Sequence, residues 1–394
     1  MVYWVQNVQA VQVVQNVWND LKRLLPSMVF LCLTLTVAQS ASAAAPQAPL
    51  TKAKLDAEAK GYLFISSHDA IVSEAKKEAK LRVLTGLDPD SIKAMTSAFK
   101  KKYPFIDLFA KEAAGIDDHQ RIILELKAGT NKEWDVITMA NDLYNQYPPY
   151  QKKFDILAMA EQGIVQIHPK MIDPQNRNIA AVTANIQVGV AFNKNRIAAE
   201  KTPDTWEDYL KPEFKGKKFV ADVRPTEIAA IVPAWGLEKT LDYSRKLALQ
   251  EPVWVRGGTR GLVSVLAGEY PMFIGNNYKT IRRAQLKDHL SVLGYKLLEP
   301  IPVRLSESVG VISTSRYPHA ALLWIEFLAS AEGQKILDEV EPFGASVYGT
   351  GSIQGQEIKG KKISLVDWDH YTKLGEYQNK IIAAYGFPKA DINR

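Results

Sequence analysis

The sequence predicts an α/β protein with two lobes, each built on a mostly parallel sheet flanked by helices. Three observations predict this fold. Residues 81–139 alternate strands with helices, residues 218–297 hold a second such set, and two alternating strand segments, 186–192 and 308–312, separate the sets. The first lobe is therefore discontinuous, the second lobe is inserted into it, and the two crossing strands form a hinge that permits closure over a ligand.

The first 45 residues differ from the rest of the chain. They contain a low-complexity Val and Gln repeat, then Lys22-Arg23, an apolar run over 28–38 and the small residues Ala41–Ala43, which is typical of a secretory signal peptide cleaved near Ala43. The basic residues lie far from the amino terminus, so either the signal is extended or the true start lies further downstream. The single cysteine, Cys32, lies within the apolar run, so the mature chain has no disulfide. We expect a periplasmic or otherwise exported protein.

Composition narrows the classes of function. Of 394 residues, 46% are apolar and 23% are charged, which is typical of a soluble globular protein. The net charge of +6 is spread along the chain, and no zinc-finger, RNA-binding or basic-zipper pattern occurs. We therefore expect no nucleic-acid partner.

The first lobe is predicted to comprise residues 81–185 and 310–394, preceded by an N-terminal helical segment over 46–80. Asp88 followed by Pro89 marks the start of its first helix.

Three strands of this lobe end at polar residues. They are predicted over 81–84, 105–109 and 135–139, with Thr85, Glu112 and Asn141 following them. Because the carboxyl ends of parallel strands meet at one edge of a sheet, these three residues are expected along that edge.

The second lobe is predicted to span residues 186–309. Its most informative stretch is 262–280, which reads as a short helix closing at Gly268, a buried strand over 270–274, a polar turn, and a second helix opening at Tyr278. Polar turns at the carboxyl ends of buried strands are where open α/β sheets bind ligands. The helix that follows offers free N–H groups to an anion. Candidate ligand-binding residues in this lobe are Arg224, Thr226, Asn277 and Tyr278.

Four phrases in a fixed order carry a family resemblance. They are TWEDYL (205–210), ADVRP (221–225), LAGEYP (266–271) and WIEFLASAEGQ (324–334). With them the chain, over roughly residues 81–336, resembles the type II periplasmic solute-binding proteins of ABC importers, in the branch that includes the ferric-ion-binding proteins. The resemblance implies a monomeric, non-catalytic protein without a resident cofactor. It implies that the protein captures a solute in an interlobe cleft and delivers it to an ABC permease.

One candidate ligand is ferric ion. Ferric-binding members carry Asn-Asn-Tyr-Tyr after the buried strand, whereas this chain carries Asn276-Asn277-Tyr278-Lys279. Tyr278 and Glu112 are the candidate metal ligands for Fe3+ as a transported solute. Ferric ion prefers anionic oxygens, and the ammonium of Lys279 has the wrong charge for holding it. The family's early histidine ligand is also missing.

The preferred ligand is a small organic anion. Arg224 follows a strand, and a guanidinium binds a carboxylate or phosphonate through two parallel hydrogen bonds. Thr85 and Asn141 of the first lobe, with Thr226 and Tyr278 of the second, would add neutral donors. Arg224 could instead pair with Asp222 or Glu227, and Thr85 and Asn141 could simply be capping residues.

Two other classes of function are open from the sequence. An enzyme is disfavoured because the chain has no Gly-x-Ser-x-Gly, His-Glu-x-x-His or P-loop motif. A ligand-sensing subunit for a membrane receptor would use the same two lobes and the same closure, so the sequence does not separate it from an importer subunit.

Overall fold

The structure, a computed structural model, describes residues 47–113, 116–139 and 141–387. The chain divides into two compact units, residues 1–56 and 57–394. The expected signal peptide lies outside the described residues. The described residues begin with helix α2 (Gln47–Ala59), most of which belongs to the first unit. The rest of the description concerns the second unit.

The first sheet has strand order β11-β10-β3-β1-β2, with β4 pairing with β10. Its strands are β1 (Lys80–Thr85), β2 (Asp107–Glu112), β3 (Val136–Met139), β4 (Ile179–Ile186), β10 (Ile301–Val311) and β11 (Ile363–Val366). β1 is parallel to β2 and β3, whereas β10 is antiparallel to β3 and β4. The sheet therefore combines the predicted parallel βαβ set with returning strands of opposite direction.

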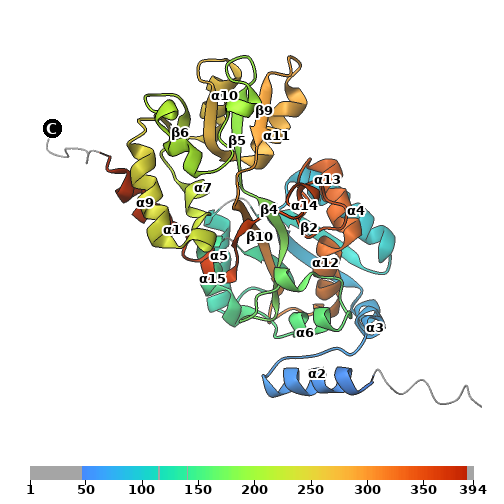
Figure 1. Cartoon of the computed structure of the whole chain (residues 1–394). Helices are drawn as coiled ribbons and strands as arrows, with labels where there is room; N and C mark the ends of the chain where they lie inside the picture. Colours follow the sequence, from blue (N-terminus) through green and yellow to red (C-terminus); the bar gives the residue numbers. More distant parts are fainter. Residues whose placement is uncertain (1–46, 114–115, 140, 388–394) are drawn as a thin grey trace, which may run out of the picture. The chain divides into compact units, whose positions relative to one another are not determined.

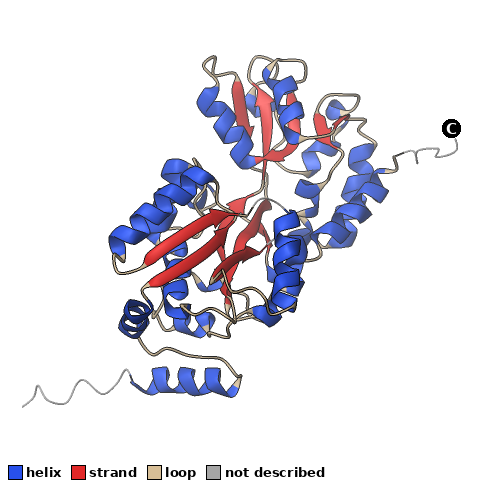
Figure 2. Cartoon of the chain, turned by 180° about the vertical axis from the view of Figure 1, so that it is seen from behind, coloured by secondary structure: helices blue, strands red, loops and turns tan. Residues whose placement is uncertain are grey.

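Helices flank this sheet and complete the first lobe (Figure 2). They are α3 (His68–Glu78), α4 (Pro89–Lys102), α5 (Ile116–Lys127), α6 (Ile156–Glu161), α12 (Pro318–Ala329), α13 (Ala331–Val340), α14 (Ile353–Glu357) and α15 (Trp368–Tyr371). The start of α4 is as the sequence predicts, because the Asp88 side chain accepts a hydrogen bond from the Ser91 N–H at 2.8 Å and Pro89 occupies the first turn. Met95 and Phe99 form the buried face of this helix.

The second sheet has strand order β7-β6-β8-β5-β9. Its strands are β5 (Val188–Asn193), β6 (Val220–Asp222), β7 (Val253–Val255), β8 (Met272–Asn277) and β9 (Leu293–Lys296). β6 is parallel to β7 and β8, and β5 is antiparallel to β8 and β9. Its helices are α7 (Thr226–Ala229), α8 (Val232–Trp235), α9 (Leu237–Ala248), α10 (Gly258–Leu266), α11 (Tyr278–Lys287) and α16 (Leu374–Tyr385).

Two crossings connect the sheets (Figure 1). In the first, β4 passes through Gln187 into β5, as the alternating segment at 186–192 predicts. The second runs over residues 297–300, between β9 and β10, and not at 308–312. β10 begins at Ile301, earlier than the sequence predicts. Its first half went unrecognised because Pro302 is unusual within a strand and because Glu307 interrupts the apolar alternation before Val309.

Two further features differ from expectation. The last helix, α16, packs its buried side chains into the core of the second lobe, against α9 and α7, so residues 310–394 do not all belong to the first lobe. β5 is buried on both faces, although its alternating sequence is typical of a strand with one solvated face. The physical reason is that Val190 faces one core cluster and Ala191 faces the opposite one.

No helix in the described ranges combines the length and the apolar character needed to cross a bilayer.

Candidate ligand site

The carboxyl edge of the first sheet carries the expected polar residues. Thr85 lies opposite Glu112 in the parallel register of β1 and β2, and Asn141 opens the 3-10 helix η1 (Asn141–Gln146) just after β3. Thr85 is buried, and its Oγ1 accepts a hydrogen bond from the Leu87 N–H at 3.3 Å. Thr85 therefore closes the turn after β1, as a capping residue does, while its O–H donor is not used by this bond.

Arg224 and Asn277 occupy equivalent positions at the carboxyl edge of the second sheet. Ala221 of β6 lies opposite Ile274 of β8, and Arg224 and Asn277 each follow three residues later. Asn277 caps α11, since its Oδ1 accepts from the Thr280 N–H at 3.1 Å.

Thr226 begins α7 in the same lobe. Its Oγ1 accepts a hydrogen bond from Gln378 Nε2 of α16 at 3.3 Å. As at Thr85, the acceptor is engaged and the hydroxyl proton is not.

Arg224 forms the salt bridge that the sequence left open as an alternative. Its Nη2 lies 3.1 Å from Asp222 Oδ2 and its Nε lies 3.4 Å from Asp222 Oδ1. The Asp222 carboxylate is buried and also accepts from the Gly257 N–H at 3.0 Å, whereas the Arg224 side chain is 57% exposed. Asp222 thus fixes one side of the guanidinium and leaves the Nη1 side open.

Tyr278 points away from this open edge. Its side chain is fully buried within a core cluster of the first lobe, and its ring centroid lies 6.0 Å from that of Phe343. The Tyr278 hydroxyl donates to Glu357 Oε1 of α14 at 2.9 Å. The Tyr295 hydroxyl and the Arg282 guanidinium donate to the same oxygen.

This environment keeps both tyrosines protonated. Burial, followed by the negative charge of Glu357, raises the pKa of Tyr278 well above its ordinary value and raises the pKa of Tyr295 to about 12. Tyr278 is therefore a neutral hydrogen-bond donor in this conformation. A ferric ligand would have to be a phenolate.

Two further cations of α11 contact the first lobe through Glu341. Lys279 Nζ and Arg283 Nη2 lie 3.4 Å and 2.6 Å from Glu341 Oε1. Lys279 therefore forms an ion pair between the lobes, because α11 packs next to the segment that follows α13.

Sequence reasoning missed Glu307, which lies on β10 with a φ of 56°. Its Oε2 is buried and has no hydrogen-bond partner among the described residues. Gly86, in the turn after Thr85, lies so close that an added Cβ would come within 2.5 Å of this oxygen. Burial raises the pKa of Glu307, while the charge of Lys279 lowers it. The positive φ of Glu307 and its contact with the turn at Gly86 could not be predicted, because neither produces a local sequence pattern.

No group of three or more His, Cys, Asp or Glu side chains in the described part of the chain is arranged to hold a metal ion. Glu112 is exposed at the end of β2, and no hydrogen bond or ion pair between described residues links it to Tyr278.

Two sheets joined by two crossings, with polar residues at the carboxyl edges of both, define a two-lobed α/β binding protein. The chain belongs to the family of bacterial extracellular solute-binding proteins, whose family model matches residues 94–350. The family resemblance and the type II fold expected from the sequence are therefore confirmed. No curated protein matches the chain.

Solved structures agree on the fold. Ferric iron-binding protein A from Mannheimia haemolytica, in an open conformation, is 17% identical with a TM-score of 0.57, over 78% of this chain and 97% of that one. The Trichodesmium protein IdiA (FutA), in complex with iron and citrate ligands, is 17% identical with a TM-score of 0.55, over 78% and 98%. Iron-bound HitA from Pseudomonas aeruginosa is 16% identical with a TM-score of 0.51, over 78% and 99%. At such low identity, these similarities show the fold alone.

Proposed function

We propose that this solute-binding protein captures a small organic anion between its two lobes and delivers it to an ABC-type permease. The hydrogen bonds of three candidate residues support this class of ligand. At Thr85, Thr226 and Asn277 the side-chain oxygen already accepts a hydrogen bond, and the hydroxyl or amide donor is left unused within the described residues. A site whose acceptors are engaged and whose donors are free suits a ligand rich in acceptors.

Arg224 supplies the charge for such a ligand. Because Asp222 holds one side of the guanidinium, little side-chain freedom is lost when the exposed side binds a carboxylate or phosphonate. Glu307 fits the same ligand if it binds a proton, because a neutral carboxyl group donates a hydrogen bond. Its raised pKa favours that form.

Ferric ion is the competing ligand. Similar solved structures include ferric-ion-binding proteins, and one of them is described in complex with both iron and citrate. In this chain the tyrosine kept from the ferric motif donates its hydroxyl proton to Glu357, and lysine follows it. Both features disfavour a site that needs phenolate oxygens.

The remaining parts of the proposal follow from the family and from the sequence. The protein is exported by the signal peptide over residues 1–45 and acts as a monomer without catalysis. A role as the ligand-sensing subunit of a membrane receptor is the alternative, because it would use the same lobes.

The test is a thermal unfolding screen of the metal-stripped protein. Aliphatic and aromatic carboxylates, phosphonates, polyamines, and ferric ion with citrate or carbonate are each added in turn. A ligand at about 100 times its Kd stabilises the folded state by about 2.7 kcal/mol, a Tm increase of several degrees. We expect the increase with a carboxylate or phosphonate alone. An increase that needs ferric ion, or that appears only with polyamines, would contradict the proposal.

A further inference from the structure

A cavity lies at the opposite end of the first sheet from the candidate ligand site. It has a volume of about 460 Å³ and lies beside the first residue of β1, Lys80, the residues just before β3, and the residues after β10. The lining residue of β1 closest to Thr85 is Arg82, and three residues at about 3.3 Å each separate it from Thr85 by about 10 Å. The two sites therefore do not share side chains.

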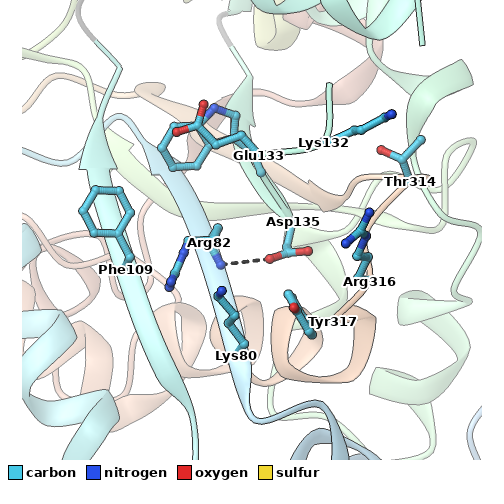
Figure 3. Close-up of a pocket in the computed structure, with 10 residues that line it drawn as sticks. Lys80, Arg82, Phe109, Lys132, Glu133, Asp135, Thr314, Arg316 and Tyr317 are labelled. Carbon is cyan, nitrogen blue, oxygen red and sulfur yellow. Dashed lines mark hydrogen bonds between the residues drawn. The ribbon is translucent and has the colours of Figure 1, made fainter. Parts of the chain in front are cut away.

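The cavity is lined by four cations, and three of them lack a carboxylate partner. Arg82 pairs with Asp107 at 3.1 Å. Lys80, Lys132 and Arg316 form no ion pair or side-chain hydrogen bond with any described residue. In the view of Figure 3, Lys80 and Arg82 lie on one side of Asp135, and Lys132 and Arg316 lie on the other.

The acidic residue among these cations is already engaged. The Asp135 carboxylate accepts hydrogen bonds from the Arg82 N–H at 2.9 Å and from Ser315 Oγ at 2.7 Å. It is buried and satisfied by these donors, so it holds the surrounding segments together. The other carboxylate that lines the cavity is the exposed Glu133, and one carboxylate does not balance three unpaired cations. The cavity therefore carries an excess of positive charge.

An aromatic surface forms part of the same lining. Phe109 on β2 is 48% exposed and stacks on Trp134, with ring centroids 6.2 Å apart and planes at 19°. The Arg82 guanidinium lies 5.7 Å from the centre of the Phe109 ring. An exposed phenyl ring beside unpaired cations offers a planar ligand both an apolar face and charge.

We propose that this cavity is a second binding site, for a small aromatic carboxylate. The ring of the ligand packs against Phe109, and its carboxylates bind Lys132, Arg316 and Lys80. The volume is within the usual range for small-molecule sites. The proposal is independent of which solute binds at the other end of the sheet.

The test is isothermal titration calorimetry of the full protein with isophthalate, an aromatic dicarboxylate, and with glutarate, an aliphatic dicarboxylate of equal charge. We expect isophthalate to bind more tightly than glutarate. The double variant Lys132→Gln/Arg316→Gln should weaken isophthalate at least tenfold. The matched control Lys246→Gln/Lys335→Gln removes two exposed cations elsewhere and should change its affinity less than twofold.

Isophthalate is itself an organic anion, so Arg224→Ala separates the two sites. We expect isophthalate binding to survive Arg224→Ala. The proposal is overturned if isophthalate does not bind, if glutarate binds equally well, or if the control double variant loses as much affinity. It is equally overturned if Arg224→Ala abolishes isophthalate binding while Lys132→Gln/Arg316→Gln leaves it intact.

Discussion

The Tyr278 hydroxyl donates a hydrogen bond to Glu357 Oε1 at 2.9 Å, and this bond links α11 of the second lobe to α14 of the first. Arg282 and Tyr295 donate to the same carboxylate oxygen. Glu357 thus accepts hydrogen bonds from three residues of the second lobe. Next to them, at the first crossing, the Tyr278 N–H donates to the Gln187 carbonyl. The tyrosine that would bind a metal in the ferric branch serves here as a structural contact between lobes.

The substitution Tyr278→Phe tests this structural role. It keeps the ring packing and removes one hydrogen bond to a charged group, so we expect the free energy of unfolding to fall by about 1.5–3 kcal/mol. Urea unfolding measures the change. The control Tyr270→Phe removes a hydroxyl that forms no hydrogen bond with any described residue and should leave stability within about 0.5 kcal/mol of the wild type. Equal stability of Tyr278→Phe and the wild type would mean that the hydroxyl is not a structural contact.

The substitution Glu341→Gln tests the ion pairs between the lobes. It removes the partner of both Lys279 and Arg283, and partly exposed pairs each contribute up to about 1 kcal/mol. We expect the two lobes of the ligand-free protein to open. Solute affinity should then fall by roughly 3- to 30-fold, because the solute binds to the form in which the lobes are closed. Small-angle scattering reports the opening. High salt should reduce the difference between variant and wild type, since salt screens such pairs.

A result against this idea would be an unchanged scattering profile together with unchanged affinity. The matched control is Glu332→Gln. It removes the partner of Lys102, an ion pair between two elements of the first lobe. Neither the opening nor the affinity should respond to it.

Glu227 is expected to make stability depend on pH. Burial is the main cause that raises its pKa to about 8, with the nearby charge of Asp222 adding to the effect. Unfolded Glu227 has lost its proton by about pH 5, whereas folded Glu227 keeps it until about pH 8. The unfolded state therefore binds fewer protons in this range, and the free energy of unfolding falls as pH rises.

Urea unfolding between pH 5 and pH 8 measures this dependence. We expect Glu227→Gln to be more stable than the wild type at pH 8, by on the order of a few kcal/mol, and the difference to shrink below about 1 kcal/mol near pH 5. Glu213→Gln, at an exposed position, should follow the wild-type slope. Parallel pH profiles for Glu227→Gln and the wild type would show that Glu227 titrates normally.

Local signals predicted much of this fold. The Asp88-Pro89 pair locates the start of α4, and the apolar runs before Thr85 and Asn141 locate β1 and β3. Each of these signals depends only on neighbours in the chain. The two strand-helix sets and the alternating segments between them then predicted the two-lobed arrangement, and the order of four family phrases agreed with it.

Long-range pairing explains what the sequence did not predict. Glu357 lies 75 residues beyond Arg282, and nothing near either residue indicates that they meet. The helix α16 joins the second lobe although it follows first-lobe elements in the chain, which an apolar pattern does not reveal. Of the candidate site residues, Arg224 and Asn277 share an edge as expected, and the burial of Tyr278 depends on contacts with α14.

Calorimetry of Arg224→Ala with the solute found in the thermal screen tests most directly whether Arg224 binds an anionic solute. Arg121→Ala is the matched control, because Arg121 is 54% exposed and also paired to acidic neighbours. We predict at least a 100-fold loss of affinity for Arg224→Ala, no loss for Arg121→Ala, and circular dichroism spectra like that of the wild type for both. Unchanged affinity in a folded Arg224→Ala protein would contradict the account.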